Sequence, residues 1–504
     1  MNLTFCVFWC YLWLSSSAYD NSVIKRVGKD VHNLRSLSSQ KNIIKNKWFV
    51  QDLDHFNVTD TRTWKQRYHM NLKYYKIGGP VFLLVGGREE ILYSWMISGA
   101  WIEYAQICNA ACFQLEHRYY GMSHPTDNLN TSNLVYLTIE QVLADLGTFI
   151  NTISIEKNQL LAHAKWVGFG SSYSGSLVTW LRLKYPHLVH ATVSSSSPLK
   201  AKINFEEYFM AVQKTLSVYN QKCELNIRQA NKIISDHLQT DYGAKYIQTK
   251  FNTCAHNLNN ATKNVQQLFR DISRFIGLIV QDDEDDREYK KIIGSRVTFG
   301  SLCDIMLDNM LGSTVDRYVA VIKKYLSVYG TQCLSNTYEW RVKYFAESSW
   351  NSTAVKCGNR QWLYQTCTEF GFFQTSNQDN HLFGNTVSLE YYTDLCTDVF
   401  GKSFNLNTLS KAVNKTNMMY GGSRSRASRI VFVQGSIDPW NTLGLSFSPK
   451  DSFTVLIKGT SHCADIHPSY SSDPPQLTEA RIKISTYLKK FLKEEDFLTD
   501  IIIS

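Results

Sequence analysis

Four short apolar runs along the chain predict strands that are buried on both faces. The first is Val-Phe-Leu-Leu-Val at 81–85, which starts after Gly78-Gly79-Pro80 and stops at Gly86-Gly87; the others lie at 166–170, 430–435 and 453–457. Continuous apolar runs of this length, bounded by turn residues, are typical of a mostly parallel sheet covered by helices.

Amphipathic segments between these runs predict helices. In 138–153, Val142, Leu146 and Ile150 recur every four residues, and 177–184 and 477–493 are also expected to be helical. Strand, turn and helix therefore alternate towards both ends of the chain, which indicates an α/β fold. The middle differs, because amphipathic helices such as 227–238 and 315–328 are separated there by polar loops. We interpret 201–400 as a helical insert between two parts of one core, 47–200 and 401–504.

The N-terminus has the pattern of a signal peptide. Residues 1–18 contain a short apolar run and end in Ser16-Ser17-Ala18, a small-residue cleavage pattern. Because no Lys or Arg precedes the run, an uncleaved anchor is the alternative. We interpret the polar, basic stretch 19–46 as a loose arm or a propeptide.

Other features agree with a secreted or lysosomal protein. No later run of 18 apolar residues occurs, so no membrane span is expected in the mature protein. Glycosylation sequons begin at Asn57, Asn130, Asn260, Asn351 and Asn414. Without the signal peptide the chain keeps ten cysteines, an even number that suits disulfides in an oxidising compartment: Cys108, Cys112, Cys223, Cys254, Cys303, Cys333, Cys357, Cys367, Cys396 and Cys463.

Composition argues against several other classes of protein. The net charge of +9 is spread widely, and its densest basic stretch, Lys25 to Lys47, lacks interleaved aromatic residues, so no nucleic-acid partner is expected. No C-x-x-C pair occurs, and Cys108 and Cys112 have no matching histidine nearby, so no metal or other cofactor is expected. The acidic run 282–286 is interpreted as a solvated loop.

The strongest candidate for chemistry is the segment Gly170-Ser171-Ser172-Tyr173-Ser174-Gly175, between a predicted strand and a predicted helix. In a nucleophile elbow, a sharp strand-to-helix turn lifts a serine out of the sheet, and small residues around that serine allow close backbone approach. Ser172 is the predicted nucleophile. A short Gly-x-Ser match alone would equally suit an ordinary tight turn.

Two downstream residues complete a triad with Ser172. A serine hydroxyl needs an imidazole to remove its proton, and the imidazole needs a carboxylate to orient it. Asp438 follows the apolar run 430–435, and His462 follows the run 453–457, which gives the order Ser, Asp, His used by α/β-hydrolases. Singly, Asp438 fits an Asp-Pro turn and His462 fits a surface loop, but together the three residues favour a triad. The predicted oxyanion donors are the amides of Tyr173 and Gly87.

These motifs belong to a longer resemblance. The chain resembles the serine carboxypeptidase family that contains lysosomal prolyl carboxypeptidase, dipeptidyl peptidase II and the thymus-specific serine protease, and is most similar to the thymus-specific branch. Coverage is about residues 45–490. The matching segments are Gln51 to Phe56, Gln66-Arg67-Tyr68, Glu116-His117-Arg118-Tyr119-Tyr120-Gly121, the elbow, Cys303 to Met306, Trp362 to Gly371, and the Asp438 and His462 motifs.

The resemblance implies an α/β-hydrolase core with an inserted, mostly helical cap, and an exopeptidase that acts on peptides, often next to proline. It also suggests Glu369 as a contact for a substrate terminus, with Trp362, Tyr364, Phe372 and Trp440 as candidate pocket residues. A homodimer is left open. An esterase could use the same triad, but the chain lacks a His-Gly-Gly-Gly oxyanion motif.

Two departures from the family pattern motivate a rival interpretation. Arg88-Glu89-Glu90 follows Gly86-Gly87 where the family usually has Glu-Gly, and Ser174 replaces a glycine. Either change could impair the site, so the alternative to an active peptidase is a catalytically silent family member that binds peptides.

Overall fold

A computed structural model describes residues 45–494 except 162, 255–257, 259–261, 284–296, 329–332, 335–336, 377–380 and 446. The signal peptide and most of the basic arm, which were predicted at 1–18 and 19–46, lie outside the described residues.

Eight strands form one sheet in the order β1-β2-β4-β3-β5-β6-β9-β10. The first two strands pair antiparallel with their neighbours, and all strands from β4 to β10 are parallel. The strands are β1 (Lys47–Asp52), β2 (Thr63–Asn71), β3 (Val81–Val85), β4 (Ala111–Leu115), β5 (Trp166–Ser171), β6 (Ala191–Ser195), β9 (Ile430–Gly435) and β10 (Phe453–Ile457). All four strands predicted from apolar runs are confirmed.

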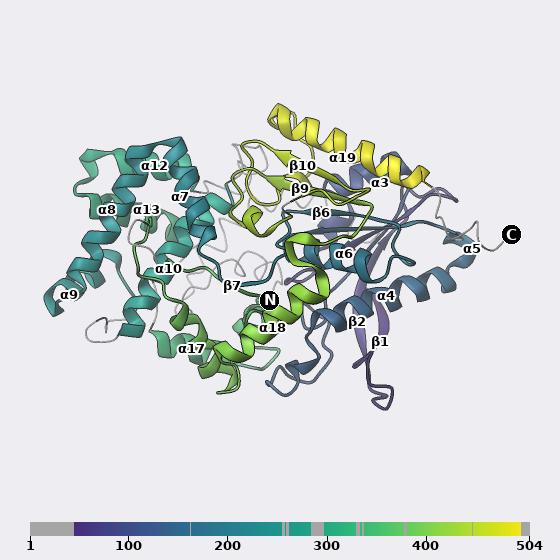
Figure 1. Cartoon of the computed structure of the whole chain (residues 1–504), viewed down its shortest axis with the longest axis horizontal. Coiled ribbons are helices and arrows are strands. Elements are labelled where there is room, and N and C mark those ends of the chain that lie inside the picture. The colour runs from purple at the N-terminus through teal and green to yellow at the C-terminus, as the bar shows by residue number, and fades with distance from the viewer. Residues whose placement is uncertain are drawn as a thin grey trace.

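Helices cover both faces of this sheet (Figure 1). On one face, α3 (Ala100–Cys108) and α19 (Pro475–Lys493) pack over a core that includes Phe82 and Phe169. On the other, α4 (Ile139–Glu156) and α6 (Tyr173–Lys184) pack over a core that includes Leu83. Successive strand residues point to opposite faces, which explains why an unbroken apolar run is needed to bury both. The chain has the α/β-hydrolase fold.

The segment between β6 and β9 lies outside the large sheet and contains the predicted insert, 201–400. In Figure 1 much of it forms a helical lobe beside the sheet. Its helices are α7 (Glu207–Tyr219), α8 (Gln221–His237), α9 (Asp241–Phe251), α10 (Thr262–Gln281), α12 (Phe299–Leu307), α13 (Thr314–Val328), α14 (Tyr338–Ala346), α15 (Thr353–Lys356), α16 (Asn359–Gln365), α17 (Leu389–Phe400) and α18 (Leu406–Tyr420). The helices predicted at 227–238 and 315–328 correspond to α8 and α13.

The insert is reinforced by covalent links and by a small sheet. Disulfides join Cys223 to Cys303, Cys254 to Cys333 and Cys367 to Cys396. Strands β7 (Lys202–Asn204) and β8 (Gly371–Phe373) pair in parallel and form this small sheet. Cys108, Cys112 and Cys463 are free thiols in the structure.

Shorter helical turns complete the fold. They are α5 (Asn158–Leu161), the 3₁₀ turns Tyr93–Met96, Leu134–Tyr136, Asn309–Leu311, Gly422–Arg424, Pro439–Leu443 and Ala464–Ile466, and a π turn at Thr366–Phe370.

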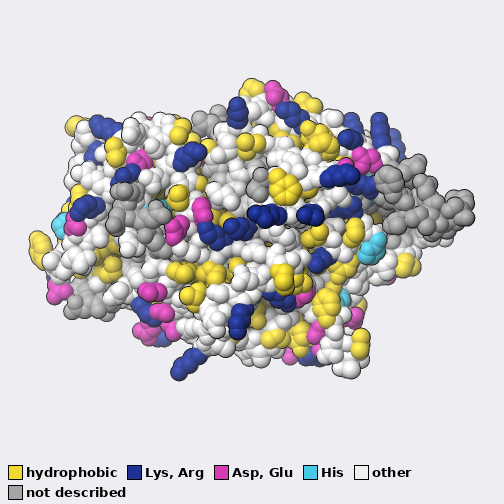
Figure 2. Space-filling view, viewed as in Figure 1, with side chains coloured by type: hydrophobic (Ala, Val, Ile, Leu, Met, Phe, Trp, Pro, Cys, Tyr) yellow, Lys and Arg dark blue, Asp and Glu magenta, His cyan; other side chains and the backbone are white. Residues whose placement is uncertain are grey.

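Four of the predicted glycosylation sites lie on the protein surface. Asn57, Asn130, Asn351 and Asn414 are exposed, as acceptor asparagines must be, whereas Asn260 lies outside the described residues. Hydrophobic, basic and acidic side chains are interspersed over the face in Figure 2. Among the helices described, none is long and apolar enough to span a bilayer.

Candidate active site

Ser172 occupies a strained turn between β5 and α6. Its backbone has φ 53° and ψ −125°, and α6 begins at the next residue. A left-handed φ costs a residue with a side chain on the order of 1–3 kcal/mol, a cost that proteins usually retain only at functional positions. The Ser172 amide donates to Ser195 O (2.8 Å), and Ser176 N donates to Ser172 O (3.1 Å), so the turn is held from both sides. This is the geometry of a nucleophile elbow.

The neighbouring small residues explain how the turn closes. A Cβ on Gly170 would lie 2.2 Å from Ser174 O, and a Cβ on Gly175 would lie 2.0 Å from Ser197 Oγ. Gly170 therefore requires glycine, because the clash is with backbone, whereas at Gly175 a side chain would first displace the Ser197 hydroxyl. Ser174, by contrast, fits the turn: its hydroxyl accepts from Ser171 N (3.0 Å) and donates to Ser171 O (2.9 Å). The serine that replaces the usual glycine is accommodated by two hydrogen bonds to the elbow itself.

Asp438 and His462 form a buried, hydrogen-bonded pair. His462 Nδ1 donates to Asp438 Oδ2 (2.9 Å), and the side chains are 10% and 0% exposed. The second carboxylate oxygen, Asp438 Oδ1, accepts from Trp440 N (2.9 Å). Burial disfavours a charged imidazole, but the Asp438 carboxylate and the neighbouring Cys463 together outweigh burial and raise the pKa of His462 well above its ordinary value of 6.5. The pair has the arrangement of a general base and its orienting acid.

The end of strand β6 ties the nucleophile turn to the histidine loop. Ser195 O accepts from Ser172 N, and the next residue, Ser196, accepts from Cys463 N through its hydroxyl (2.8 Å). Ser195 Oγ also donates to Asp465 Oδ2 (2.6 Å). Two adjacent serines therefore hold Ser172 and the loop of His462 at one place. The Ser172 hydroxyl itself makes no hydrogen bond to His462 or to any other described side chain. Apo sites often tighten only when substrate binds.

The predicted oxyanion donors lie on either side of the elbow. Tyr173 is the first residue of α6, so its amide has no acceptor within the helix. Gly87 lies beside the turn, since a Cβ on it would be 3.8 Å from Ser174 Cβ. Both residues therefore lie near Ser172, and their role as oxyanion donors stays a prediction.

The Glu-His-Arg-Tyr-Tyr-Gly motif at 116–121 contacts the side chain of Tyr173, directly and through Gln365. His117 Nδ1 donates to Arg118 O (2.6 Å), so its Nε2 accepts from Tyr173 OH (3.1 Å). Burial lowers the pKa of His117 to about 4, which keeps the imidazole neutral. Gln365 donates to Tyr173 OH (2.8 Å) and accepts from Tyr120 OH (2.6 Å). Tyr173, whose amide is a predicted oxyanion donor, is thus held by residues of both the core and the insert.

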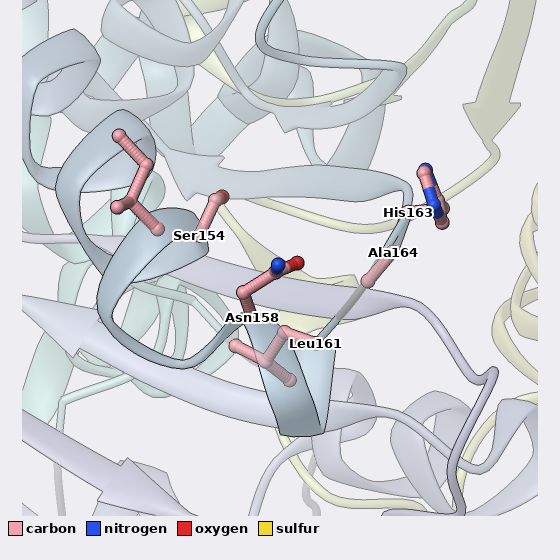
Figure 3. A pocket seen from close by; sticks show the side chains of 6 residues that line it. Ser154, Asn158, Leu161, His163 and Ala164 are labelled. Atoms are coloured by element: carbon pink, nitrogen blue, oxygen red, sulfur yellow. The ribbon is translucent and has the colours of Figure 1, made fainter.

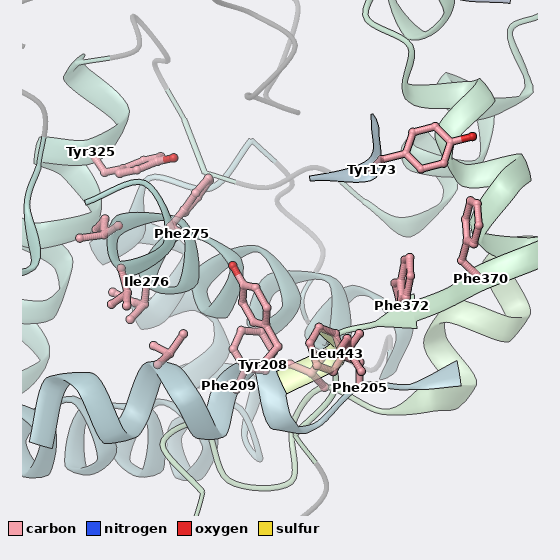
Figure 4. Close-up of a cluster of buried hydrophobic side chains, with 14 of the residues drawn as sticks. Tyr173, Phe205, Tyr208, Phe209, Phe275, Ile276, Tyr325, Phe370, Phe372 and Leu443 are labelled. Atoms are coloured by element: carbon pink, nitrogen blue, oxygen red, sulfur yellow. The ribbon is translucent and has the colours of Figure 1, made fainter. Parts of the chain in front are cut away.

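A group of aromatic rings lies between Tyr173 and His462. Trp362 lies 5.4 Å from Tyr173 between ring centroids, Phe372 lies 5.5 Å from Trp440, and Trp440 lies 6.3 Å from His462. Figure 4 shows Tyr173 and Phe372 in one cluster with side chains of α7 and α10. Three of the four predicted pocket residues therefore share this region.

The remaining predicted residues have other surroundings. Tyr364 packs against Phe400 and Phe404 in a separate cluster. The Arg88 guanidinium lies 5.1 Å from the centre of the Trp362 ring, a cation–π contact.

Glu369 lies at the start of helix α4. Its Oε1 accepts from Ile139 N (2.9 Å), the first amide of that helix, and its backbone carbonyl accepts from Thr416 Oγ1 (2.8 Å). Burial raises the pKa of Glu369 to about 8. These contacts give Glu369 a structural role in joining α4 to the insert, and its contact with a substrate terminus stays a prediction.

A surface hollow elsewhere does not resemble an active site. It lies between the end of α4 and the start of β5 (Figure 3) and is lined by Ser154, Ile155, Asn158, Leu161, His163 and Ala164. None of the predicted site residues is among them.

Comparisons with known proteins identify the family of this chain. Residues 51–484 match the family model described as serine carboxypeptidase S28. The chain is 32% identical to the human thymus-specific serine protease over 497 residues, covering 94% of this chain and 93% of that protein. It is 33% identical to the mouse thymus-specific serine protease (89% and 88%) and 26% identical to the bovine lysosomal Pro-X carboxypeptidase (89% and 88%). The chain therefore belongs to the serine carboxypeptidase S28 family.

Proposed function

We propose that this serine-type peptidase is an exopeptidase that hydrolyses peptides through Ser172, His462 and Asp438. The observation that carries the proposal is the hydrogen-bonded Asp438–His462 pair, tied through strand β6 to a serine in a strained elbow. Family membership supports the serine-peptidase class, and the geometry supports these three residues as the machinery.

The proposed reaction proceeds in two halves. His462 removes the proton from Ser172 Oγ as that oxygen attacks the peptide carbonyl, and Asp438 stabilises the imidazolium that forms. The amides of Tyr173 and Gly87 donate to the oxyanion. His462 then protonates the leaving amine, the C–N bond breaks, and an acyl-enzyme remains on Ser172. Water, activated by the same histidine, hydrolyses the ester and restores the free serine.

Exopeptidase action and a preference for proline are the finer parts of the proposal. The related bovine protein carries the name Pro-X carboxypeptidase. A proline ring needs a rigid apolar pocket. Trp362, Phe372 and Trp440 provide apolar rings beside Tyr173 and His462. A peptide library with proline or alanine next to the scissile bond, blocked at one or the other terminus, tests both points. We expect release of terminal residues only, fastest beside proline. Cleavage within peptides blocked at both ends would contradict exopeptidase action.

The rate should depend on pH through His462. A general base must be neutral, and kcat/KM reports the ionisation of the free enzyme. Because the pKa of His462 lies well above 6.5, we expect kcat/KM to fall as the pH drops through that raised value. The enzyme should therefore be more active at neutral pH than in an acidic compartment. Measurement of kcat/KM from acidic to alkaline pH checks this, and an acid limb centred below 6.5 would contradict it.

We further propose entry into the secretory pathway, with delivery outside the cell or to lysosomes, and glycosylation at the exposed sequons. The relatives named as lysosomal and the three disulfides support this route.

Two alternatives to a peptidase are tested by the same assays. A folded wild-type protein that hydrolyses esters but no peptide would favour an esterase, and one that hydrolyses neither would favour a silent peptide binder.

A further inference from the structure

The C-terminal end of helix α10 lies against both loops that carry the acid–base pair. Helix α10 belongs to the segment between β6 and β9, whereas Asp438 and His462 follow β9 and β10. Gln281 is the last residue of α10 and is buried. Its side chain contacts one catalytic loop and its backbone carbonyl contacts the other.

Four hydrogen bonds form a closed ring through Gln281. His462 N donates to Gln281 O (3.1 Å), and His462 Nδ1 donates to Asp438 Oδ2 (2.9 Å). Asp438 Oδ1 accepts from Trp440 N (2.9 Å), and the Trp440 indole Nε1 donates to Gln281 Oε1 (2.8 Å). Asp438 and His462 therefore each take part in two of these hydrogen bonds. One of the four residues in the ring, Gln281, comes from the insert.

Neighbouring contacts fix the orientation of the Gln281 amide. Its Oε1 also accepts from Tyr208 OH (3.0 Å), and its Nε2 donates to Asp282 Oδ1 (3.0 Å). Just beyond the helix, Ser461 Oγ donates to the backbone carbonyl of Asp283. The end of α10 thus docks on the histidine loop at two successive points.

We infer that Gln281 is a positioning residue for the Asp438–His462 pair, so that the helical insert takes part in the catalytic machinery. The inference rests on the proposed function. Gln281 touches no reacting atom. It acts through Trp440, whose backbone amide fixes Asp438 Oδ1, and through the His462 backbone. Catalysis is sensitive to such placement, because a misplacement of about 1 Å can cost about 100-fold in rate.

Helix α10 supplies a matched control. Gln267 is also fully buried, its Oε1 accepts from Tyr391 OH, and its Nε2 donates to Asp271 Oδ2 (2.6 Å). None of these partners belongs to a catalytic loop. Replacement of either glutamine by methionine removes a buried amide of similar size from the same helix, so the two variants share the loss of packing and hydrogen bonds and differ in the contact with the acid–base pair.

The test compares Gln281→Met, Gln267→Met and Trp440→Phe with wild type, by kcat, KM and melting temperature on one peptide substrate. We expect Gln281→Met to lower kcat by about 10- to 100-fold with KM changed by less than about threefold. Trp440→Phe removes the indole donor, should act in the same direction, and should combine with Gln281→Met less than additively. Gln267→Met should lower the melting temperature and leave kcat near the wild-type value.

Equal kcat for Gln281→Met and wild type would overturn the inference, as would an equal loss of kcat in Gln267→Met. If Gln281→Met fails to fold, Trp440→Phe gives the same test, because it removes the same hydrogen bond, from Trp440 Nε1 to Gln281 Oε1, by a change in the core. A wild-type protein that neither hydrolyses peptides nor reacts at Ser172 would instead contradict the proposed function on which this inference rests.

Discussion

Replacing Ser172 by alanine is expected to lower kcat for peptide hydrolysis by about 10⁶-fold, the scale on which loss of the nucleophile acts in serine peptidases. Alanine keeps the Cβ and the same backbone preference, so the elbow and its hydrogen bonds to Ser195 and Ser176 should persist. Only the nucleophilic oxygen is lost. The measurement is kcat for the best library peptide, with circular dichroism and thermal unfolding to establish that the variant is folded.

Ser171→Ala is the matched comparison for this variant. Ser171 precedes the nucleophile, and the bonds that it makes with Ser174 use its backbone amide and carbonyl, which the substitution retains. Its rate should stay within about threefold of wild type, the range of a substitution without a named structural cost. A folded Ser172→Ala protein with wild-type kcat would show that another group is the nucleophile.

The second large effect is expected for Asp438→Asn, which should lower kcat by about 10⁴-fold. An asparagine amide in place of Oδ2 cannot accept from His462 Nδ1–H and favours the wrong tautomer of the imidazole. The loss of the carboxylate also removes the largest of the causes that raise the pKa of His462, the charge of Asp438, so that pKa should fall. The residual activity should therefore show an acid limb at lower pH than wild type. The measurement is the pH profile of kcat/KM for both proteins.

A useful comparison is Asp465→Asn, which alters a second buried carboxylate near the histidine loop. Asp465 accepts from Ser195 Oγ (2.6 Å), and among the described residues no hydrogen bond joins it to the His462 imidazole. Its variant should lose stability more than catalytic rate, and its acid limb should stay close to that of wild type. If Asp438→Asn keeps both the rate and the pH profile of wild type, Asp438 is not the orienting acid.

Unbroken apolar runs predicted the strands that are buried on both faces of the sheet. The runs 81–85 and 430–435 coincide with β3 and β9, because a strand in the middle of a parallel sheet must be apolar along its whole length. Strand β6, Ala-Thr-Val-Ser-Ser, was missed because its small and hydroxylated residues give no apolar run, although all five are buried. The placement of serines at its end reflects their hydrogen bonds to the elbow and to the histidine loop.

The site was predictable where chemistry follows directly after a strand. Ser172, Asp438 and His462 each follow such a run, so their meeting at one edge of the sheet could be foreseen. Ser196 and Gln281 could not be, because their partners are backbone amides and an indole contributed by distant segments. The disulfide pairing could not be predicted from the sequence either, since an even number of cysteines does not specify which thiols pair. Both departures that suggested a silent protein have an explanation only in three dimensions: Ser174 bonds to Ser171, and Arg88 lies over Trp362.

The most direct test of the account is to map the site of covalent modification by an active-site fluorophosphonate on the purified protein. The account predicts a single adduct on Ser172, formed faster at neutral than at acidic pH, absent from Ser172→Ala and retained by Ser171→Ala. A folded wild-type protein that forms no adduct, or an adduct on a different serine, would contradict the assignment of Ser172 as an activated nucleophile.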